Sequence, residues 1–449
     1  MSEYDVLVVG SGAAGTTAAE RCAGAGRRVA IVDRLPYGGT CRLRGCDPKK
    51  VLVGAAEAVD WVRRMAGSGI AGESHIDWPE LMRFKHTFTD SVPSQREDEL
   101  RKAGVTTYHG TACFTSATSM RVAGETVEAK NVVLACGAWP AKLGLEGEEH
   151  LIDSTGFLDL PQLPKRIAFI GGGYIAFEFA HLSARAGASP VILQRGPRVL
   201  TGFEPSLVDR IVAIGGEVGV DVRTNAEITS VEKIASGFAV CGNVSGEPLR
   251  LECDLVVHAA GRAPDLDDLA LGTGNVERTK KGIAVNEFLQ SRSNPAVYAV
   301  GDCADGGGLA LTPAATYEGD LAGRNILEGN AHRPDFDGLA SIVYTIPSLG
   351  SVGLTTAQAR ERALPFRVAE GDSTQWYSSR RVRARCSAYR LLIGEANGEL
   401  LGAHVMGPHT EELINVFSLA IRAKVPVSTL QATLFAYPTA SSDIEAMTA

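Results

Sequence analysis

Residues 4–33 have the sequence YDVLVVGSGAAGTTAAERCAGAGRRVAIVD. A short apolar run comes first, followed by a glycine-rich turn, a stretch of small residues and a second apolar run that ends at Asp33. Short apolar runs bounded by glycine are typical of buried strands, and the stretch between them has the composition and length of a helix. The order strand, glycine turn, helix, strand, acid predicts one βαβ unit of the kind that binds a dinucleotide.

Each glycine of the first turn has a separate physical task. Gly10 permits the tight turn, Gly12 lets a pyrophosphate approach the backbone, and Gly15 lets the helix pack against the strand. The helix N-terminus then faces the phosphates, and Asp33 is placed to bind a ribose hydroxyl. The alternative is a purely structural glycine turn. The complete strand, helix and acid around the motif favour a dinucleotide site.

A second unit of the same kind lies further along the chain, at residues 166–193. Its glycine turn begins at Gly171 and includes Gly173. No acid follows its second strand, and the chain offers Arg195 and Arg198 instead. Arginine binds a 2′-phosphate that an acid would repel, so we expect NADPH in preference to NADH. The alternative is that both arginines belong to a solvated surface.

Two cysteines, Cys41 and Cys46, are the expected chemical centre. A helix that starts here would favour the thiolate over the thiol, and Arg42 and Arg44 would act in the same direction and attract an anionic substrate. A buried free-cysteine pair is one alternative. A metal site is another, but it would need two more ligands, which no nearby Cys or His supplies, so we expect no metal. We expect the other cysteines to be small core residues: Cys22, Cys113, Cys136, Cys241, Cys253, Cys303 and Cys386.

The overall composition restricts the class of protein. The chain has 449 residues, 45% of them hydrophobic, and a net charge of −8, which argues against nucleic acid as a partner. We expect no membrane span and no signal peptide, because no apolar stretch approaches ~20 residues and no basic region precedes the first apolar run. Nine cysteines are too few for a secreted disulfide scaffold, so we expect a cytoplasmic protein.

Several stretches together resemble the pyridine nucleotide–disulfide oxidoreductases, the family of glutathione reductase, dihydrolipoamide dehydrogenase and mercuric reductase. The resemblance covers essentially the whole chain. Residues 38–50, GGTCRLRGCDPKK, are similar to the active-site signature of the family. Further segments are similar to the family's flavin-binding, central and interface motifs: residues 133–140, 258–264, 299–302, 311–313 and 344–353.

The resemblance implies an α/β fold with two Rossmann-like dinucleotide-binding domains, for FAD and NAD(P), and a C-terminal α+β dimerisation domain. It divides the chain into an FAD-binding domain in two parts, residues 1–152 and 275–333, an NAD(P)H-binding domain, residues 153–274, and an interface domain, residues 334–449. It implies a homodimer that takes a small-molecule substrate.

The resemblance also assigns roles to individual residues. Cys46 would exchange electrons with the flavin, and Cys41 would be the outer thiol that attacks the substrate. Lys49 would lie near the reactive flavin nitrogen and pair with Glu178, and Tyr174 would gate the nicotinamide pocket. The residues expected to bind the cofactors are Gly10, Gly12, Gly15, Asp33, Gly39, Thr40, Lys50, Ala112, Gly137, Asp302, Leu311, Thr312, Gly171, Gly173, Tyr174, Ile175, Arg195, Arg198 and Gly261.

The C-terminal segment departs from the family pattern. Disulfide reductases of the family have a histidine and a glutamate there, and this chain has Tyr437 and Ser442 in their places, with Asp443 one residue further on. Tyrosine has a pKa near 10 and is a poor base at neutral pH. Mercuric reductases resemble the chain in having this tyrosine, but they also carry a C-terminal cysteine pair, and this chain has no cysteine after Cys386.

Three functions compete at this point. The first is NADPH-dependent reduction of a disulfide, possibly a small anionic one, through FAD and the Cys41–Cys46 pair. The second is reduction of a different acceptor, such as a quinone, a metal ion or another electrophile. The third is a redox sensor or binding flavoprotein without steady turnover. The presence of Lys49, Glu178 and Tyr174 argues against the third.

Overall fold

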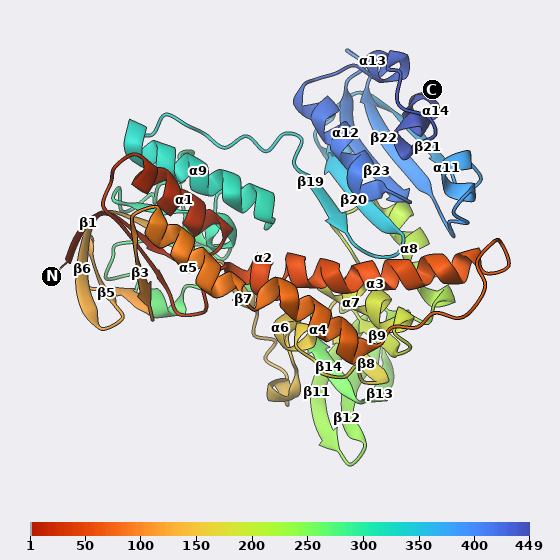
Figure 1. Cartoon of the computed structure of the whole chain (residues 1–449), viewed down its shortest axis with the longest axis horizontal. Helices are drawn as coiled ribbons and strands as arrows, with labels where there is room; N and C mark the ends of the chain where they lie inside the picture. The colour runs from red at the N-terminus through yellow and green to blue at the C-terminus, as the bar shows by residue number, and fades with distance from the viewer. Residues whose placement is uncertain (1) are drawn as a thin grey trace. The chain divides into compact units, whose positions relative to one another are not determined.

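The computed structural model describes residues 2–449. The chain forms two compact units, and each is assembled from separate stretches of sequence (Figure 1). Of the described residues, one unit comprises 2–49, 83–141 and 262–336, and the other comprises 50–82, 142–261 and 337–449. Both units mix helices with sheets, so the α/β fold class expected from the sequence is confirmed.

The first unit is built on a sheet whose central part is parallel. The order begins β3 (Val105–His109), β2 (Val29–Asp33), β1 (Ser2–Val9) and β6 (Glu125–Leu134). Next to β6 lie β17 (Val297–Ala299) and the antiparallel strands β5 (Ser119–Val122) and β4 (Ala112–Phe114). Parallel strands buried on both faces need nearly continuous apolar sequence, as residues 6–9 and 29–32 have.

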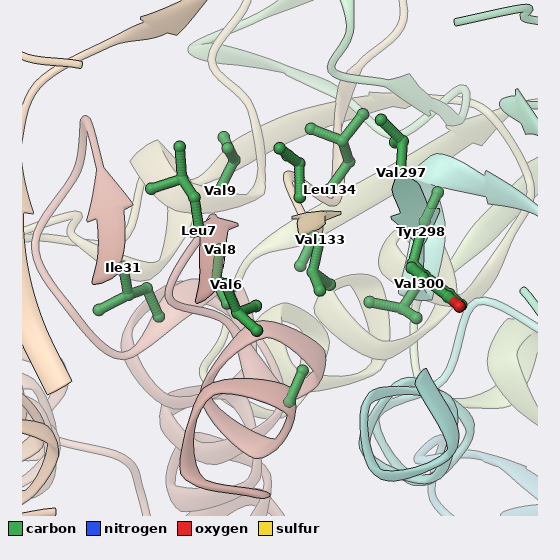
Figure 2. Packing of buried hydrophobic residues seen from close by; sticks show 14 of the residues in the cluster. Val6, Leu7, Val8, Val9, Ile31, Val133, Leu134, Val297, Tyr298 and Val300 are labelled. Atoms are coloured by element: carbon green, nitrogen blue, oxygen red, sulfur yellow. The ribbon is translucent and has the colours of Figure 1, made fainter. Parts of the chain in front are cut away.

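The core of the first unit lies along these parallel strands. Val6, Val8, Ile31, Val133 and Val297 are each at most 1% exposed. Figure 2 shows such side chains in line across β2, β1, β6 and β17. Each fully buried aliphatic side chain stabilises the fold by about 1.5–3 kcal/mol relative to an exposed one, so this line of contacts holds the strand ends in register.

Two helices of the first unit cross at very close range. These are α1 (Ala13–Gly24) and α9 (Thr312–Glu328). A Cβ atom on Gly319 would lie 2.2 Å from the carbonyl oxygen of Ala14, so the crossing requires glycine in α9. The N-terminus of α9, which carries Thr312, is thereby fixed against the start of α1.

The helices after the cysteine pair differ from the sequence expectation. The apolar pattern predicts a helix over residues 51–65, but α3 spans Cys46–Met65, and the shorter α2 (Gly39–Arg44) precedes it. The polar stretch at residues 78–104 contains α4 (Trp78–Thr89) and α5 (Val92–Lys102). Pro93 lies in the first turn of α5, where its missing N–H costs no helical hydrogen bond.

The second unit contains its own parallel sheet, in the order β10 (Asp221–Arg223), β9 (Ser189–Leu193), β8 (Arg166–Ile170) and β14 (Leu255–His258). The helix α7 (Tyr174–Arg185) connects β8 to β9, which is the predicted second βαβ arrangement. An antiparallel sheet of β11 (Ala226–Ile234), β12 (Gly237–Val244) and β13 (Glu247–Cys253) follows α8 (Pro205–Glu217) and β10.

The C-terminal part of the second unit is an antiparallel sheet with helices. Its strand order is β19 (Ala340–Val343), β20 (Ser348–Gly353), β23 (Leu400–Gly407), β22 (Ala388–Gly394) and β21 (Phe366–Asp372). Its helices are α10 (Thr356–Glu361), α11 (Tyr377–Arg380), α12 (Thr410–Arg422), α13 (Val427–Ala432) and α14 (Ile444–Thr448).

Shorter elements complete the chain. They are β7 (Ala138–Pro140), η1 (Glu148–His150), α6 (Ser154–Leu158), β15 (Arg262–Pro264), η2 (Asp267–Leu269), β16 (Ile283–Ala284), η3 (Gly301–Cys303), β18 (Ala304–Asp305) and η4 (Ala440–Asp443). Among residues 2–449, no helix has the length and apolar character that a membrane crossing requires.

The close crossing of α1 and α9 gives a test of the fold. Gly319→Ala is expected to lower the free energy of unfolding by about 1–3 kcal/mol, because the added methyl group overlaps the Ala14 carbonyl. Denaturant unfolding measures the change. The matched control is Gly24→Ala at the end of α1, where no described heavy atom lies within 4 Å of the new Cβ. An equal effect of the two substitutions would show that the crossing tolerates a side chain.

Candidate active site

The first glycine turn is held by contacts between backbones. Gly10 has φ +106°, and a Cβ there would lie 2.3 Å from the oxygen of Ala135. A Cβ on Gly15 would lie 2.0 Å from the oxygen of Gly10, and one on Gly39 would lie 2.5 Å from Cα of Gly12. Each of these positions therefore excludes any side chain.

The middle glycine of this turn is different, because it faces open space. No heavy atom of the described residues lies within 4 Å of the position of a Cβ on Gly12. Gly12 is the N-cap of α1, and no side chain of the described part of the chain caps that helix end. Free backbone N–H groups at a helix N-terminus, beside an open glycine, fit a pyrophosphate. The residues present therefore fit a dinucleotide such as FAD.

Asp33 ends β2 and organises the same turn. One of its carboxylate oxygens accepts hydrogen bonds from the backbone N–H of Ser11 at 2.8 Å and from the Ser11 hydroxyl at 2.7 Å. The other accepts from the N–H of Leu35 at 2.8 Å. The acid that the sequence assigns to a ribose hydroxyl thus also holds the loop on which the phosphates would lie.

Further predicted cofactor residues lie where the parallel strands of the first unit end. Gly137 follows β6, and Asp302 follows β17 in η3. Leu311 is the N-cap of α9, and Thr312 is its first residue. Burial raises the pKa of Asp302, and the charge of Arg262 opposes that shift. In open α/β sheets, ligands bind at the carboxyl ends of the strands, so these positions fit the expectation.

A buried carboxyl group at this edge was missed by the sequence reasoning. Glu318 in α9 is 3% exposed and accepts a hydrogen bond of 2.6 Å from the N–H of Gly301. Burial raises its pKa to about 7, and the N–H of Gly301 opposes that shift. Glu318 steadies the turn that carries Asp302. Nothing in the helical sequence around Glu318 distinguishes it from a surface acid.

Cys41 and Cys46 lie together in the structure, and the first is half-buried while the second is exposed. Cys41 belongs to α2, and Cys46 is the first residue of α3. The Cys46 sulfur lies 3.7 Å from the Thr312 hydroxyl oxygen, and the Cys41 sulfur lies 3.9 Å from a carboxylate oxygen of Asp47. The break at Gly45 between the two helices therefore brings the thiols together.

The two thiols differ strongly in acidity. The hydrogen bond from Cys41 lowers the pKa of Cys46 to about 6, with help from Thr312 and the charge of Lys49 and against the effect of burial. The same hydrogen bond raises the pKa of Cys41, and burial adds to that increase. At neutral pH the reduced pair therefore holds one proton on Cys41 and a thiolate at Cys46. A thiolate is the reactive form of cysteine.

The lysines and the threonine next to this pair have distinct surroundings. Lys49 is buried, whereas Thr40 is exposed. Lys50 forms an ion pair with Glu57 at 2.9 Å, and its ammonium group lies 4.5 Å from the ring centre of Tyr344. The predicted pairing of Lys49 with Glu178 stays a prediction. Within its own unit, Glu178 is 6% exposed and accepts a 2.9 Å hydrogen bond from the N–H of Tyr344.

The second glycine turn repeats the geometry of the first. Gly171 has φ +115°, and a Cβ there would lie 2.2 Å from the oxygen of Ala259. Gly173 is the N-cap of α7, and within residues 2–449 no heavy atom is within 4 Å of its Cβ position. The turn fits a second dinucleotide for the reason given for the first.

Four of the other predicted residues lie close to this turn in the sequence, and two lie elsewhere in the chain. Tyr174, the first residue of α7, is 39% exposed and packs edge to face on Phe203 at 5.4 Å. Arg195 is exposed just after β9, and Arg198 lies 3.4 Å from a carboxylate oxygen of Asp209. The remaining three predicted residues are Ile175 in α7, Gly261 with φ +110° after β14, and Ala112 in β4 of the first unit.

The C-terminal segment carries an exposed tyrosine pair. Tyr437 is 78% exposed and stacks on Tyr377 of α11 at 6.3 Å with an interplanar angle of 28°. Ser378 donates a hydrogen bond to Asp443, and burial raises the pKa of that carboxyl group. The helix α11 therefore contacts both Tyr437 and Asp443.

Comparison with known proteins decides the family. The profile of the pyridine nucleotide-disulphide oxidoreductases matches residues 4–319, and that of their dimerisation domain matches residues 339–448. The chain belongs to this family. Its members use FAD and a pyridine nucleotide, and this oxidoreductase is a flavin-dependent enzyme of the disulfide oxidoreductase class.

The relatives align over almost their whole length. A glutathione reductase of Burkholderia cepacia is 32% identical over 98% of this chain and 97% of its own. A dihydrolipoyl dehydrogenase of Bacillus subtilis (strain 168) is 32% identical over 97% of this chain and 94% of its own. The Cu(II) complex of the HOCl-induced flavoprotein disulfide reductase RclA from Escherichia coli superimposes with a TM-score of 0.89 at 24% identity, covering 100% and 99% of the two chains. This last likeness establishes the fold.

The split acidity of the thiol pair predicts a pH dependence. Because the pKa of Cys46 is lowered, its thiolate is present above about pH 6 and is lost as the pH falls through that value. In reduced Cys41→Ser the serine hydroxyl still donates, so alkylation of Cys46 should keep a midpoint near pH 6. In Cys41→Ala the donor is absent, so the midpoint should move up toward about 8.5. Mass spectrometry of the Cys46 peptide after timed alkylation measures both midpoints. Equal midpoints would rule out the hydrogen bond as the cause.

Proposed function

We propose that this flavoprotein passes electrons from NADPH through FAD to the Cys41–Cys46 disulfide and from there to a disulfide substrate. The observation that carries the proposal is the thiol pair itself, in which Cys46 has a lowered pKa and Cys41 keeps the proton. When bound, NADPH and FAD supply hydride transfer and a two-electron carrier. Gly10, Gly12 and Gly15 would hold the FAD pyrophosphate.

The proposed arrangement of domains follows the family. Residues 1–152 and 275–333 would bind FAD, residues 153–274 would bind NADPH, and residues 334–449 would form the interface of a homodimer. The other residues proposed for FAD are Asp33, Gly39, Thr40, Lys50, Ala112, Gly137, Asp302, Leu311 and Thr312. Those proposed for NADPH are Gly171, Gly173, Tyr174, Ile175, Arg195, Arg198 and Gly261. Lys49 and Glu178 would form an ion pair at the catalytic centre.

The proposed reaction at the thiols needs only the reduced pair, the acceptor and water. The Cys41 sulfur attacks one sulfur of the acceptor, so a mixed disulfide forms while the acceptor's own S–S bond breaks, and the proton of Cys41 passes to the leaving sulfur. The Cys46 thiolate then attacks the Cys41 sulfur, which restores the Cys41–Cys46 disulfide and releases a second thiolate. Tyr437 of a second copy would donate a proton to that thiolate and regain one from water. Arg42 is exposed beside the pair and would attract an anionic acceptor.

A second candidate function is reduction of a non-disulfide acceptor such as a quinone or a metal ion. The observation that favours it is the exposed stack of Tyr437 on Tyr377, where the family's disulfide reductases have a histidine. Cys41 must lose its proton before it attacks a disulfide, and tyrosine is a weak base for that step. An aromatic pair offers a flat apolar surface to a quinone instead.

The first test is an anaerobic NADPH titration of the purified protein, followed by its visible spectrum. We expect a long-wavelength absorbance band after two electrons, due to a Cys46 thiolate beside oxidised FAD. Cys41→Ser should show the band before any NADPH is added, and Cys46→Ser should never show it. Disulfide reduction should fall about a thousandfold or more in both variants. Bleaching without the band, or quinone reduction that exceeds every disulfide activity and survives in Cys41→Ser, would support the second function.

The preference for NADPH has its own test. Arg195→Ala is expected to raise the KM for NADPH about 10- to 100-fold, because a charged hydrogen bond contributes about 1.5–3 kcal/mol. The KM for NADH should change little, since NADH lacks the 2′-phosphate. Steady-state kinetics with both nucleotides and one common acceptor provide the comparison. Equal changes for the two nucleotides, or a wild-type protein that prefers NADH, would remove Arg195 from phosphate recognition.

A further inference from the structure

A second pair of thiols lies in the first unit, just after the ends of two neighbouring strands. Cys136 follows the end of β6, and Cys303 is the last residue of η3, which follows β17. The strands β6 and β17 are parallel neighbours in register at Leu134 and Ala299. The Cys303 sulfur lies 3.3 Å from the carbonyl oxygen of Leu134, two residues before Cys136. The sequence suggests two unrelated core cysteines, and the sheet brings them together.

The two thiols are hydrogen-bonded to each other. Cys303 is fully buried, and Cys136 is half-buried. The hydrogen bond from Cys136 lowers the pKa of Cys303, as do the backbone N–H groups of Gly137 and Cys136, against the effect of burial. The hydrogen bond to Cys303 raises the pKa of Cys136, and burial adds to it.

This arrangement provides a partner for each state of Cys303. The protonated thiol donates to the carbonyl oxygen of Leu134 or of Val300, each at 3.3 Å. The thiolate accepts from the Cys136 thiol and from two backbone N–H groups. A buried thiol next to no other thiol behaves differently, because burial raises the pKa of Cys22 and of Cys253 to about 11. Oxidants react with the thiolate form of cysteine. Cys303 is therefore expected to react faster than Cys22 or Cys253.

We propose that Cys136 and Cys303 form a second redox-active thiol pair, which a hydroperoxide closes to a disulfide. The burial of the pair restricts the oxidant to a small molecule. The Cys303 sulfur attacks a peroxide oxygen, so an S–O bond forms, the O–O bond breaks and the leaving oxygen is protonated. The Cys136 sulfur then attacks the Cys303 sulfur, and the S–O bond breaks as water leaves with the proton of Cys136. With hydrogen peroxide the two thiols give one disulfide and two molecules of water.

The site is separate from the Cys41–Cys46 pair and does not depend on which acceptor the enzyme reduces. The turn that carries Cys136 packs on the first glycine turn, since a Cβ on Gly10 would lie 3.2 Å from Cα of Cys136. The turn η3, which carries Cys303, also carries Asp302 next to it. A disulfide here would link the two turns at the strand ends where FAD is proposed to bind.

The test is peptide mapping of the FAD-loaded protein after treatment with hydrogen peroxide. Remaining thiols are alkylated at intervals, and linked peptides are identified by mass spectrometry. We expect a peptide that joins Cys136 to Cys303, while Cys22 and Cys253 stay reduced as internal controls. In Cys136→Ala the link is absent, and loss of the free Cys303 thiol should slow about tenfold, because the hydrogen-bond donor of its thiolate is removed. Flavin content of the variant checks that it folds.

Two results would overturn the proposal. One is a wild-type protein in which Cys136 and Cys303 both stay free while Cys41 and Cys46 become oxidised. The other is oxidation of Cys22 at the same rate as Cys303, which would show that accessibility alone decides the reaction. Both results come from the wild-type protein, so they do not depend on the stability of the variant. Neither bears on the function proposed for the Cys41–Cys46 pair.

Discussion

The geometry of both glycine turns, the proposed nucleotide sites, depends on one steric constraint, the contact of a glycine backbone with the end of a neighbouring strand. At Gly10 the neighbour is the carbonyl of Ala135, and at Gly171 it is the carbonyl of Ala259. A side chain at either glycine would overlap that oxygen, so the turn could not close over the sheet. Each turn leads into a helix, α1 or α7, so the free backbone N–H groups of the helix N-terminus lie near the strand ends. Within each unit, the helix, the turn and the strand ends therefore form a cradle of their own.

The chemistry depends on how the chain divides one proton between two sulfurs. Gly45 separates α2 from α3, and α3 begins at Cys46. The helix N-terminus, the donor at Cys41 and the charge of Lys49 all favour a thiolate at Cys46. Burial raises the pKa of Cys46, and these groups together outweigh that effect. The proton remains on Cys41, which in the proposed reaction is the outer thiol.

The C-terminal segment is held by contacts with one short helix. Tyr437 stacks on Tyr377, and Asp443 accepts a hydrogen bond from Ser378. Both partners belong to α11. The position of this segment within the second unit therefore depends on α11.

The two βαβ units, the family and the cysteine pair could be predicted from the sequence, because glycine spacing and strand periodicity are local and leave few alternatives. The sequence placed the start of the helix after Cys46 five residues too late, since Asp47, Pro48 and the lysines lack an apolar period. The contact of Cys136 with Cys303 and the burial of Glu318 could not be predicted in this way and are seen only in the folded chain. Cys136 and Cys303 lie far apart in the chain, and the pairing of β6 with β17 brings them together. Glu318 lies within a helix, and the packing of that helix buries it. No local sequence pattern encodes either arrangement.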